Sequence, residues 1–257
     1  AAGKGFCAGV DRARVATDGL GDLGELGVGF GDGDAQLRCG GRRGEATRMQ
    51  AGQQSFAQLL LDDALPASRV LADGYGQCNT KGTLLMALLR GLDVPCRFHG
   101  FTIDKGLQRG IVPELVFPIA PKSIIHSWVE VLHNDTWINL EGFILDQNVL
   151  SALQSKFPDR NTLCAYGAGT DSLQSPKVAW TGQSTYIQKT GINHDFGIFE
   201  TPDQFYANHR QLTGLRGLLY RNAIRHWMNA RVASLRKGHV PAIPGGPAKL
   251  LPTSGGI

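Results

Sequence analysis

The residue in this sequence best placed to act as a nucleophile is Cys78. It follows a turn that contains Gly74 and Gly76. It precedes an apolar segment, Thr83–Arg90, whose leucines repeat four residues apart, as they do in a helix. The first N–H groups of a helix lack partners within it and the helix dipole is positive there, so both favour a thiolate and a developing oxyanion. This position predicts a reactive thiol, with a buried structural cysteine as the alternative.

A histidine and a carboxylate on the next two predicted strands can serve this thiol. His126 lies in Ile124–Leu132, which is rich in β-branched and aromatic residues, and Glu141 ends the strand Thr136–Glu141. If the intervening turn has two residues, both side chains point to the same face and the carboxylate can fix the imidazole tautomer. A three-residue turn favours Asp146 instead. The alternatives are a structural histidine and a solvated carboxylate.

The surrounding pattern predicts a mixed α+β domain. We expect a short helix over Gln53–Leu65, a strand over Pro95–Ile103 and a proline-rich loop after that strand. The segment Phe205–Arg236 is typical of one or two helices. Its interleaved arginines and histidines indicate a solvated helix face, with an anionic-surface binder as the alternative.

Three segments together resemble the transglutaminase-like superfamily of papain-like cysteine enzymes. They are Gly76–Cys78 with the helix that follows, His126–Val131, and Trp137–Glu141. The resemblance extends over about residues 70–146. It implies a nucleophile helix packed on an antiparallel sheet, with a helical C-terminal extension in this chain.

The same resemblance implies a catalytic triad of Cys78, His126 and Glu141. The family usually has aspartate at the third position, so Glu141 is a departure, and Asp146 is the residue that can take over its role. The implied activity is cysteine-dependent acyl transfer on amide bonds through an acyl-enzyme, ending in hydrolysis or in transfer to an amine. The implied substrate is a protein or peptide, and an inactive binding module is the alternative.

Composition narrows the other classes of function. The 257 residues are 42% hydrophobic and 19% charged, with a net charge of +4 that is spread along the chain, so we expect no nucleic-acid partner. No apolar run reaches 18 residues and no secretory signal is visible, so we expect no membrane partner. Five cysteines, an odd number, favour a reducing compartment and a cytoplasmic protein. Without CxxC or HExxH, we expect no metal and no cofactor.

Four further positions have two interpretations each, and one short segment has a single interpretation. Gln77 either donates to the oxyanion or caps the turn, and Trp128 and Trp137 either line a substrate groove or pack in the sheet. Cys96 is interpreted as a core residue rather than a metal ligand, and Asn193–Asp195 as a loop.

The chain divides into four predicted parts. Residues 1–48 are rich in glycine and expected to be disordered, and residues 49–200 form the transglutaminase-like domain. Residues 201–238 are the helical extension and residues 239–257 a disordered tail rich in proline and glycine. The sequence predicts no oligomeric state.

Overall fold

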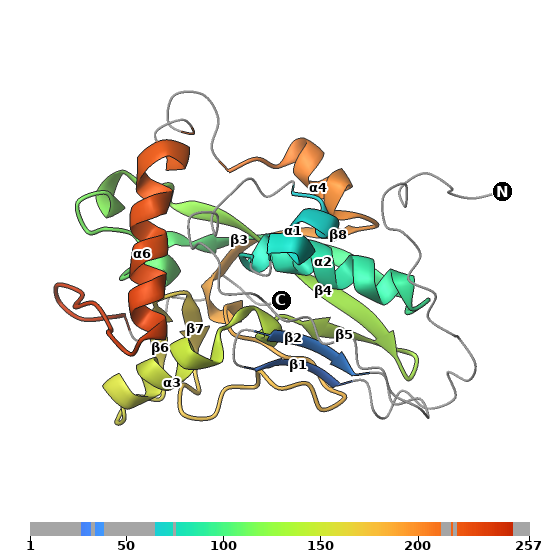
Figure 1. The fold of residues 1–257 in the computed structure, drawn as a ribbon, viewed down its shortest axis with the longest axis horizontal. Helices are drawn as coiled ribbons and strands as arrows, with labels where there is room; N and C mark the ends of the chain where they lie inside the picture. Colours follow the sequence, from blue (N-terminus) through green and yellow to red (C-terminus); the bar gives the residue numbers. More distant parts are fainter. Residues whose placement is uncertain are drawn as a thin grey trace.

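A four-stranded antiparallel sheet runs through the protein (Figure 1). The structure is a computed structural model that describes residues 27–31, 34–38, 65–73, 76–211, 217 and 220–248. The strand order is β5-β4-β3-β8, so sheet neighbours β3, β4 and β5 are consecutive in the chain. The bounds are β3 Cys96–Asp104, β4 Ser123–His133, β5 Thr136–Leu140 and β8 Ile192–Phe199. The mixed helix and antiparallel sheet predicted from the sequence is confirmed.

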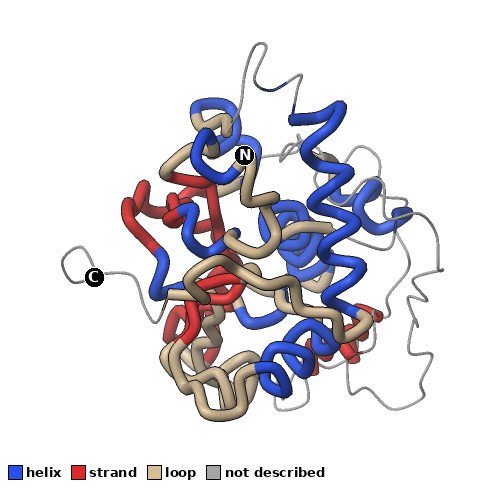
Figure 2. Tube along the Cα trace, turned by 90° about the vertical axis from the view of Figure 1, so that its left-hand side faces the viewer, coloured by secondary structure: helices blue, strands red, loops and turns tan. Residues whose placement is uncertain are grey.

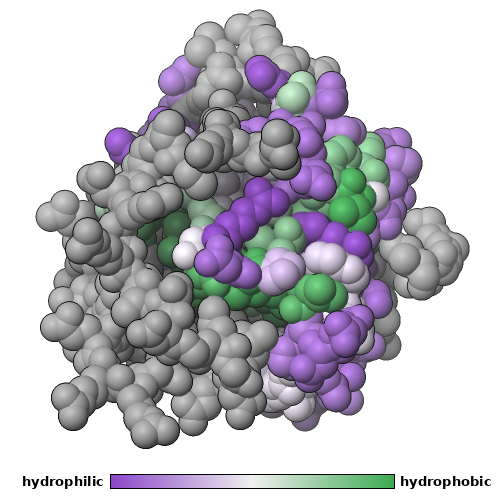
Figure 3. Space-filling model, turned by 90° about the vertical axis from the view of Figure 1, so that its right-hand side faces the viewer, coloured by the Kyte–Doolittle hydropathy of each residue, from purple (hydrophilic) through white to green (hydrophobic). Residues whose placement is uncertain are grey.

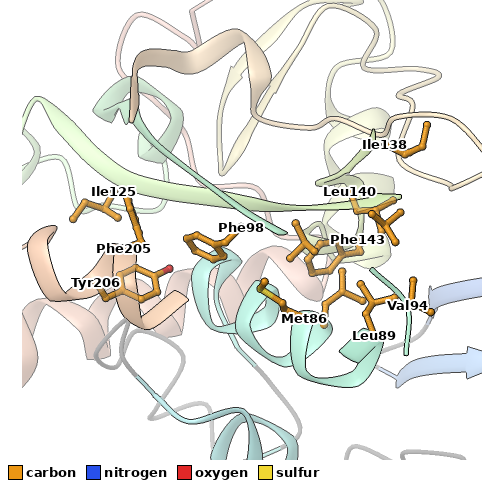
Figure 4. Packing of buried hydrophobic residues seen from close by; sticks show 13 residues of the cluster. Met86, Leu89, Val94, Phe98, Ile125, Ile138, Leu140, Phe143, Phe205 and Tyr206 are labelled. Atoms are coloured by element: carbon orange, nitrogen blue, oxygen red, sulfur yellow. The ribbon is translucent and has the colours of Figure 1, made fainter. Parts of the chain in front are cut away.

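Helix α2, Cys78–Gly91, packs against β4 and buries one face of the sheet. Helix α1, Ala67–Asp73, lies beside α2, and α4, Pro202–Asn208, adds two aromatic side chains to the same core. Figure 4 shows these side chains meeting between helix and strands. The buried cluster comprises Leu85, Met86, Leu89, Val94, Phe98, Ile125, Val129, Val131, Ile138, Leu140, Phe143, Phe205 and Tyr206.

A second apolar cluster joins the later elements. It includes residues of α3, β6 and β7 together with Leu235 of α6. The bounds of these elements are α3 Gln147–Lys156, β6 Leu163–Ala165, β7 Ala168–Thr170, the π-helix η7 Tyr220–Ile224 and α6 Arg225–Arg236. The remaining elements are β1 Gly27–Gly31, β2 Asp34–Arg38 and the 3₁₀ turns η3 Lys105–Gln108, η4 Phe117–Ile119, η5 Gly142–Ile144 and η6 Lys189–Gly191.

The C-terminal end of α2 differs in detail from the sequence prediction. The apolar segment of the prediction ended at Arg90, and the helix continues through Gly91. The residue in the left-handed region is Asp93, with φ of 57°. Aspartate tolerates that conformation better than most residues, and the N–H of Val94 then closes the end by donating to Leu89 O at 2.9 Å.

The β4–β5 hairpin has the two-residue turn on which the site prediction depended. His133 pairs with Thr136, and the loop residues Asn134 and Asp135 have φ of 49° and 58°. Positive φ at both positions is typical of a type I′ turn, whose twist matches that of the strands. This register places residue 126 and residue 141 on the same face of the hairpin.

Polar residues form a network on the sheet, centred on the buried carboxylate of Glu130 in β4. Its carboxylate accepts from Arg97 Nε at 2.6 Å and from His99 Nδ1 at 2.6 Å, and His99 Nε2 donates to Asp195 at 2.8 Å. Burial alone would raise the pKa of Glu130, but hydrogen bonds from His99 and Arg97 outweigh it and lower the pKa. The network therefore keeps a buried carboxylate ionised.

Four sequence predictions need correction or fall outside the described residues. Asn193–Asp195 lies in strand β8 rather than in a loop, and pairs with β3. Residues 239–248 are not a disordered tail, because Ile243 is buried and Ala248 bridges to Cys164 of β6. The expected helix Gln53–Leu65 lies almost wholly outside the described residues, as do most of residues 1–48, of which β1 and β2 form a hairpin. The other domain boundaries stay predictions.

Helix α6 lies on the side of the molecule that the N-terminal end of α2 faces (Figure 1). Figure 1 shows α6 beside that end, and in Figure 2, turned by 90°, α6 lies in front of α2, which is seen nearly end-on. Figure 3 shows a band of hydrophobic residues crossed by hydrophilic ones on the opposite side of the molecule. None of the described helices is long and apolar enough to cross a bilayer.

Candidate active site

The site is built around a fully buried pair, His126 of β4 and Glu141 at the end of β5. Both side chains are 0% exposed, and His126 Nε2 donates to Glu141 Oε1 at 2.7 Å. The two-residue turn described above brings them to one face, as the sequence predicted. A carboxylate on one ring nitrogen fixes the tautomer and leaves the other nitrogen, Nδ1, to exchange a proton.

The second oxygen of Glu141 is held by the backbone. Oε2 accepts from the N–H of Ile187 at 2.9 Å and from that of Gln188 at 3.1 Å. The backbone N–H of Glu141 in turn donates to Thr185 Oγ1 at 3.2 Å. The two bonds to Oε2 fix the orientation of the carboxylate, and the bond to Thr185 fixes the backbone that carries it. The segment 185–188 thus supports glutamate at the third position, although the pattern of the sequence gave no sign of it.

Cys78 is the first residue of α2 and is half-buried. The backbone before it is tied down, because the N–H of Gln77 donates to Thr80 Oγ1 at 2.9 Å. This contact caps the turn before α2, which was one of the two interpretations of Gln77. It is made by the backbone N–H of Gln77. The thiol lies 3.8 Å from Asn79 Oδ1.

The electrostatics of His126 link it to both neighbours. Burial by itself lowers the pKa of this imidazole, but hydrogen bonds and charges from Cys78 and Glu141 outweigh burial and raise the pKa to about 10. Nδ1 is buried and makes no hydrogen bond of ordinary geometry within the described residues. Such contacts are often loose in ligand-free sites and tighten when substrate binds. The ring can therefore hold a proton between a sulfur and a carboxylate.

Asp146, the alternative third residue, is engaged elsewhere. Its Oδ1 caps α3 by accepting from the N–H of Asn148 at 2.9 Å and of Val149 at 3.2 Å, and its Oδ2 pairs with Arg236 Nε of α6 at 2.6 Å. These contacts use both oxygens. The geometry therefore favours Glu141 over Asp146 as the partner of the imidazole.

A desolvated ammonium group lies one turn along α2 from the thiol. Lys81 Nζ donates to Ile144 O at 3.1 Å. Burial, and then the charge of Arg236, lower the pKa of Lys81 to about 8, against opposing contributions from Asp146 and Cys78. No sequence pattern indicates this residue, because its partners come from η5, from the N-cap of α3 and from α6.

The other candidate residues have structural contacts. Trp128 is 4% exposed and packs against the rings of Phe101 and Tyr186, whereas Trp137 is 37% exposed and lies under the Arg97 guanidinium. Trp128 is thus a packing residue, and Trp137 is open to solvent.

The two other described cysteines have thiols that resist ionisation. Burial raises the pKa of Cys96, and burial together with the charge of Asp104 raises the pKa of Cys164 to about 11. In the part of the chain that the structure describes, no group of three or more histidine, cysteine or carboxylate side chains could hold a metal ion. Cys96 and Cys164 therefore serve as internal references for the reactivity of Cys78.

Comparison with known families identifies the region that holds the site. Residues 54–142 match the family model described as the transglutaminase-like superfamily. This match confirms the resemblance seen in the sequence, and it contains Cys78, His126 and Glu141 but ends before Asp146. Neither the comparison with curated proteins nor the comparison with solved structures found a match.

Gly142, next to Glu141, provides a test of how tightly the site is packed. A Cβ at this position would lie 2.4 Å from the carbonyl oxygen of Val178, a backbone atom that cannot move by a rotamer change. We expect Gly142→Ala to reduce the free energy of unfolding by about 1–3 kcal/mol and to slow labelling of Cys78 by iodoacetamide. Urea unfolding and mass spectrometry measure these effects.

The matched control is Gly91→Ala, where an added Cβ meets nothing within 4 Å. It should leave both the stability and the labelling rate at or slightly above the wild-type values. Equal behaviour of the two variants would contradict the packing described for Gly142.

Proposed function

We propose that the protein is a cysteine-dependent acyl-transfer enzyme that acts on amide bonds of a protein or peptide through an acyl-enzyme. The observation that carries the proposal is the buried imidazole of His126. It is hydrogen-bonded to an oriented carboxylate, and the Cys78 side chain helps to raise its pKa. A structural histidine would need no such pair of partners. In this proposal α2 is the nucleophile helix, packed on the antiparallel sheet.

The first step is formation of the acyl-enzyme. The Cys78 proton rests on His126 Nδ1, which leaves an imidazolium beside a thiolate, and the thiolate attacks the carbonyl carbon of the substrate. The N–H groups in the first turn of α2 are available to stabilise the oxyanion. As the C–N bond breaks, the imidazolium returns its proton to the leaving amine, and a thioester remains on the sulfur.

The second step regenerates the enzyme. Water or a primary amine attacks the thioester carbonyl, His126 takes the proton of the attacking group, and the C–S bond breaks. Throughout the cycle Glu141 accepts the hydrogen bond of His126 Nε2 and stabilises the imidazolium. The described cysteines are free thiols, which suits the reducing cytoplasm that we propose as the location.

A trapped intermediate tests the proposal. The wild-type protein is mixed with p-nitrophenyl acetate and with a panel of short peptide thioesters and amides, quenched in acid and digested. We expect an acyl adduct on the peptide that contains Cys78, with a burst of product equal to the enzyme concentration. Faster turnover and an amide product in the presence of methylamine indicate transfer. If both changes are absent, the reaction is hydrolysis.

The outcome that would reject the enzyme is also defined. A folded protein that forms no adduct on Cys78, even with the activated ester, is an inactive binding module of the same fold. An adduct that forms equally on Cys96 would show non-specific acylation, because the thiol of Cys96 has a raised pKa and, among the described residues, donates to the carbonyl oxygen of Met86 rather than to a histidine.

A further inference from the structure

One buried side chain, that of Asn79, joins the start of α2 to strand β4 at the site. Asn79 follows Cys78 and is 3% exposed. Its Nδ2 donates to the carbonyl oxygen of Ile125 at 3.2 Å, and its Oδ1 accepts from Ser127 Oγ at 3.0 Å. Ile125 and Ser127 are the residues on either side of His126. The two hydrogen bonds therefore connect the backbone that carries the thiol to the backbone that carries the imidazole.

The orientation of this amide is fixed by its partners. The Ile125 carbonyl can only accept, so the amide nitrogen of Asn79 must face it. That leaves Oδ1 toward the Ser127 hydroxyl and toward the Cys78 sulfur, 3.8 Å away. A flipped amide would set two carbonyl oxygens against each other. The contact between α2 and β4 is thus specified in both distance and direction.

We propose that Asn79 is a positioning residue that sets the separation of the Cys78 sulfur from the His126 ring. The inference rests on the proposed function of that pair, and it adds the residue that brings them together. Breaking buried hydrogen bonds at both ends of one amide leaves polar groups unsatisfied, so the local structure shifts to restore them. A displacement of about 1 Å in a catalytic pair can cost about a hundredfold in rate.

The test is the rate of Cys78 alkylation by iodoacetamide, followed by peptide mass spectrometry from pH 5 to pH 10. In Asn79→Ala we expect the rate at pH 7 to fall roughly 10- to 100-fold. We also expect the pH of half-maximal labelling to rise, because the imidazolium no longer stabilises the thiolate. A merely structural role would lower stability without moving this pH profile.

Asn193→Ala is the matched control. This asparagine also links strands by both ends of its amide, since it accepts from Thr102 Oγ1 at 2.5 Å and donates to Ser123 Oγ at 3.1 Å. It does not join α2 to β4. The Asn193→Ala protein should keep the wild-type rate and the wild-type pH profile.

Asn79→Asp separates geometry from charge. The carboxylate cannot donate to the Ile125 carbonyl, and it places a negative charge beside the Cys78 sulfur. The protein should therefore be labelled more slowly than Asn79→Ala at pH 7. If neither Asn79 variant folds, Ser127→Ala, which removes only the hydroxyl that donates to Oδ1, should show a smaller shift in the same direction.

The results that would overturn the inference are distinct from failure of the proposed function. A folded Asn79→Ala protein, or in its place a folded Ser127→Ala protein, that is labelled at the wild-type rate and pH overturns the positioning role. A wild-type protein that forms no acyl-enzyme rejects the function. In that case, an Asn79-dependent pH profile would still show that Asn79 aligns the pair.

Discussion

Replacing Cys78 with alanine should abolish acyl-enzyme formation and reduce ester turnover by more than about a thousandfold. The sulfur is the group that forms the covalent bond in the proposed cycle. Among the described residues, the side chains that raise the pKa of His126 are Cys78 and Glu141, and of these Cys78 is the nucleophile. The variant should remain folded, because Cys78 is only half-buried and alanine suits a helix. Turnover of p-nitrophenyl acetate and circular dichroism measure the two effects.

Variants of the other described cysteines separate this effect from general loss of thiols. Cys96→Ala and Cys164→Ala should retain turnover, since the raised pKa of each keeps it out of the chemistry. Substantial turnover in a folded Cys78→Ala protein would show that the nucleophile has been assigned to the wrong residue.

Replacing Glu141 with glutamine should reduce turnover by about a thousand- to ten-thousandfold while preserving the shape of the side chain. Oε2 already accepts two backbone N–H groups, so the amide nitrogen of glutamine must face His126 instead. A donor at that position forces Nε2 to accept and moves the ring proton to Nδ1. The imidazole is then in the wrong tautomer to take the proton of Cys78.

Glu130→Gln is the matched control, because the sheet contains a second buried glutamate bound to a histidine. Glu130 accepts from His99 at 2.6 Å, and its other side-chain partners among the described residues are Arg97 and Trp128 rather than Cys78. The variant should lose stability and keep its turnover, measured on the fraction that is folded. Equal loss of turnover in Glu130→Gln and Glu141→Gln would mean that both residues act only through the fold.

Glu141→Asp tests the departure from the usual family residue. Aspartate is one methylene shorter, so it cannot reach both the imidazole and the Ile187–Gln188 backbone with the bonds that glutamate makes. We expect turnover between that of the wild type and that of Glu141→Gln. The contacts of segment 185–188 thus suit the length of glutamate at this position.

The sequence predicted the parts of the site that depend on local pattern. Leucines four residues apart gave α2, and β-branched and aromatic residues gave β4 and β5. The sequence left open a turn of two or of three residues, and only the two-residue turn, which the register shows, places His126 and Glu141 on one face. The interpretation of Asn193–Asp195 as a loop was wrong, because its polar residues lie on an edge strand where they can face solvent or side-chain partners.

The contacts that the sequence did not predict come from distant segments. The backbone that holds Glu141 lies more than 40 positions along the chain, and Arg236, which pairs with Asp146, lies on α6. Asn79 was overlooked for a similar reason: its partners are on β4 and no local periodicity indicates them. Such contacts are set by tertiary packing rather than by propensity, so one sequence without relatives gives little sign of them.

The raised pKa of His126 also makes the stability of the folded protein depend on pH. Its pKa is raised in the folded protein, so its ion pair contributes stability fully below the unfolded value of about 6.5, and this contribution is lost as the pH rises through about 10. Removing the sulfur in Cys78→Ala should lower the pKa of His126, because two of the contributions that raise it come from Cys78.

The most direct test of the account is the titration of His126 by ¹⁵N NMR in histidine-labelled protein, with His126→Gln used to assign the signal. The account predicts an imidazolium that persists through pH 8 in the wild type and titrates at a lower pH in Cys78→Ala. A His126 signal that titrates near pH 6.5 in the wild type, and does not move in Cys78→Ala, would contradict the pairing of these two side chains.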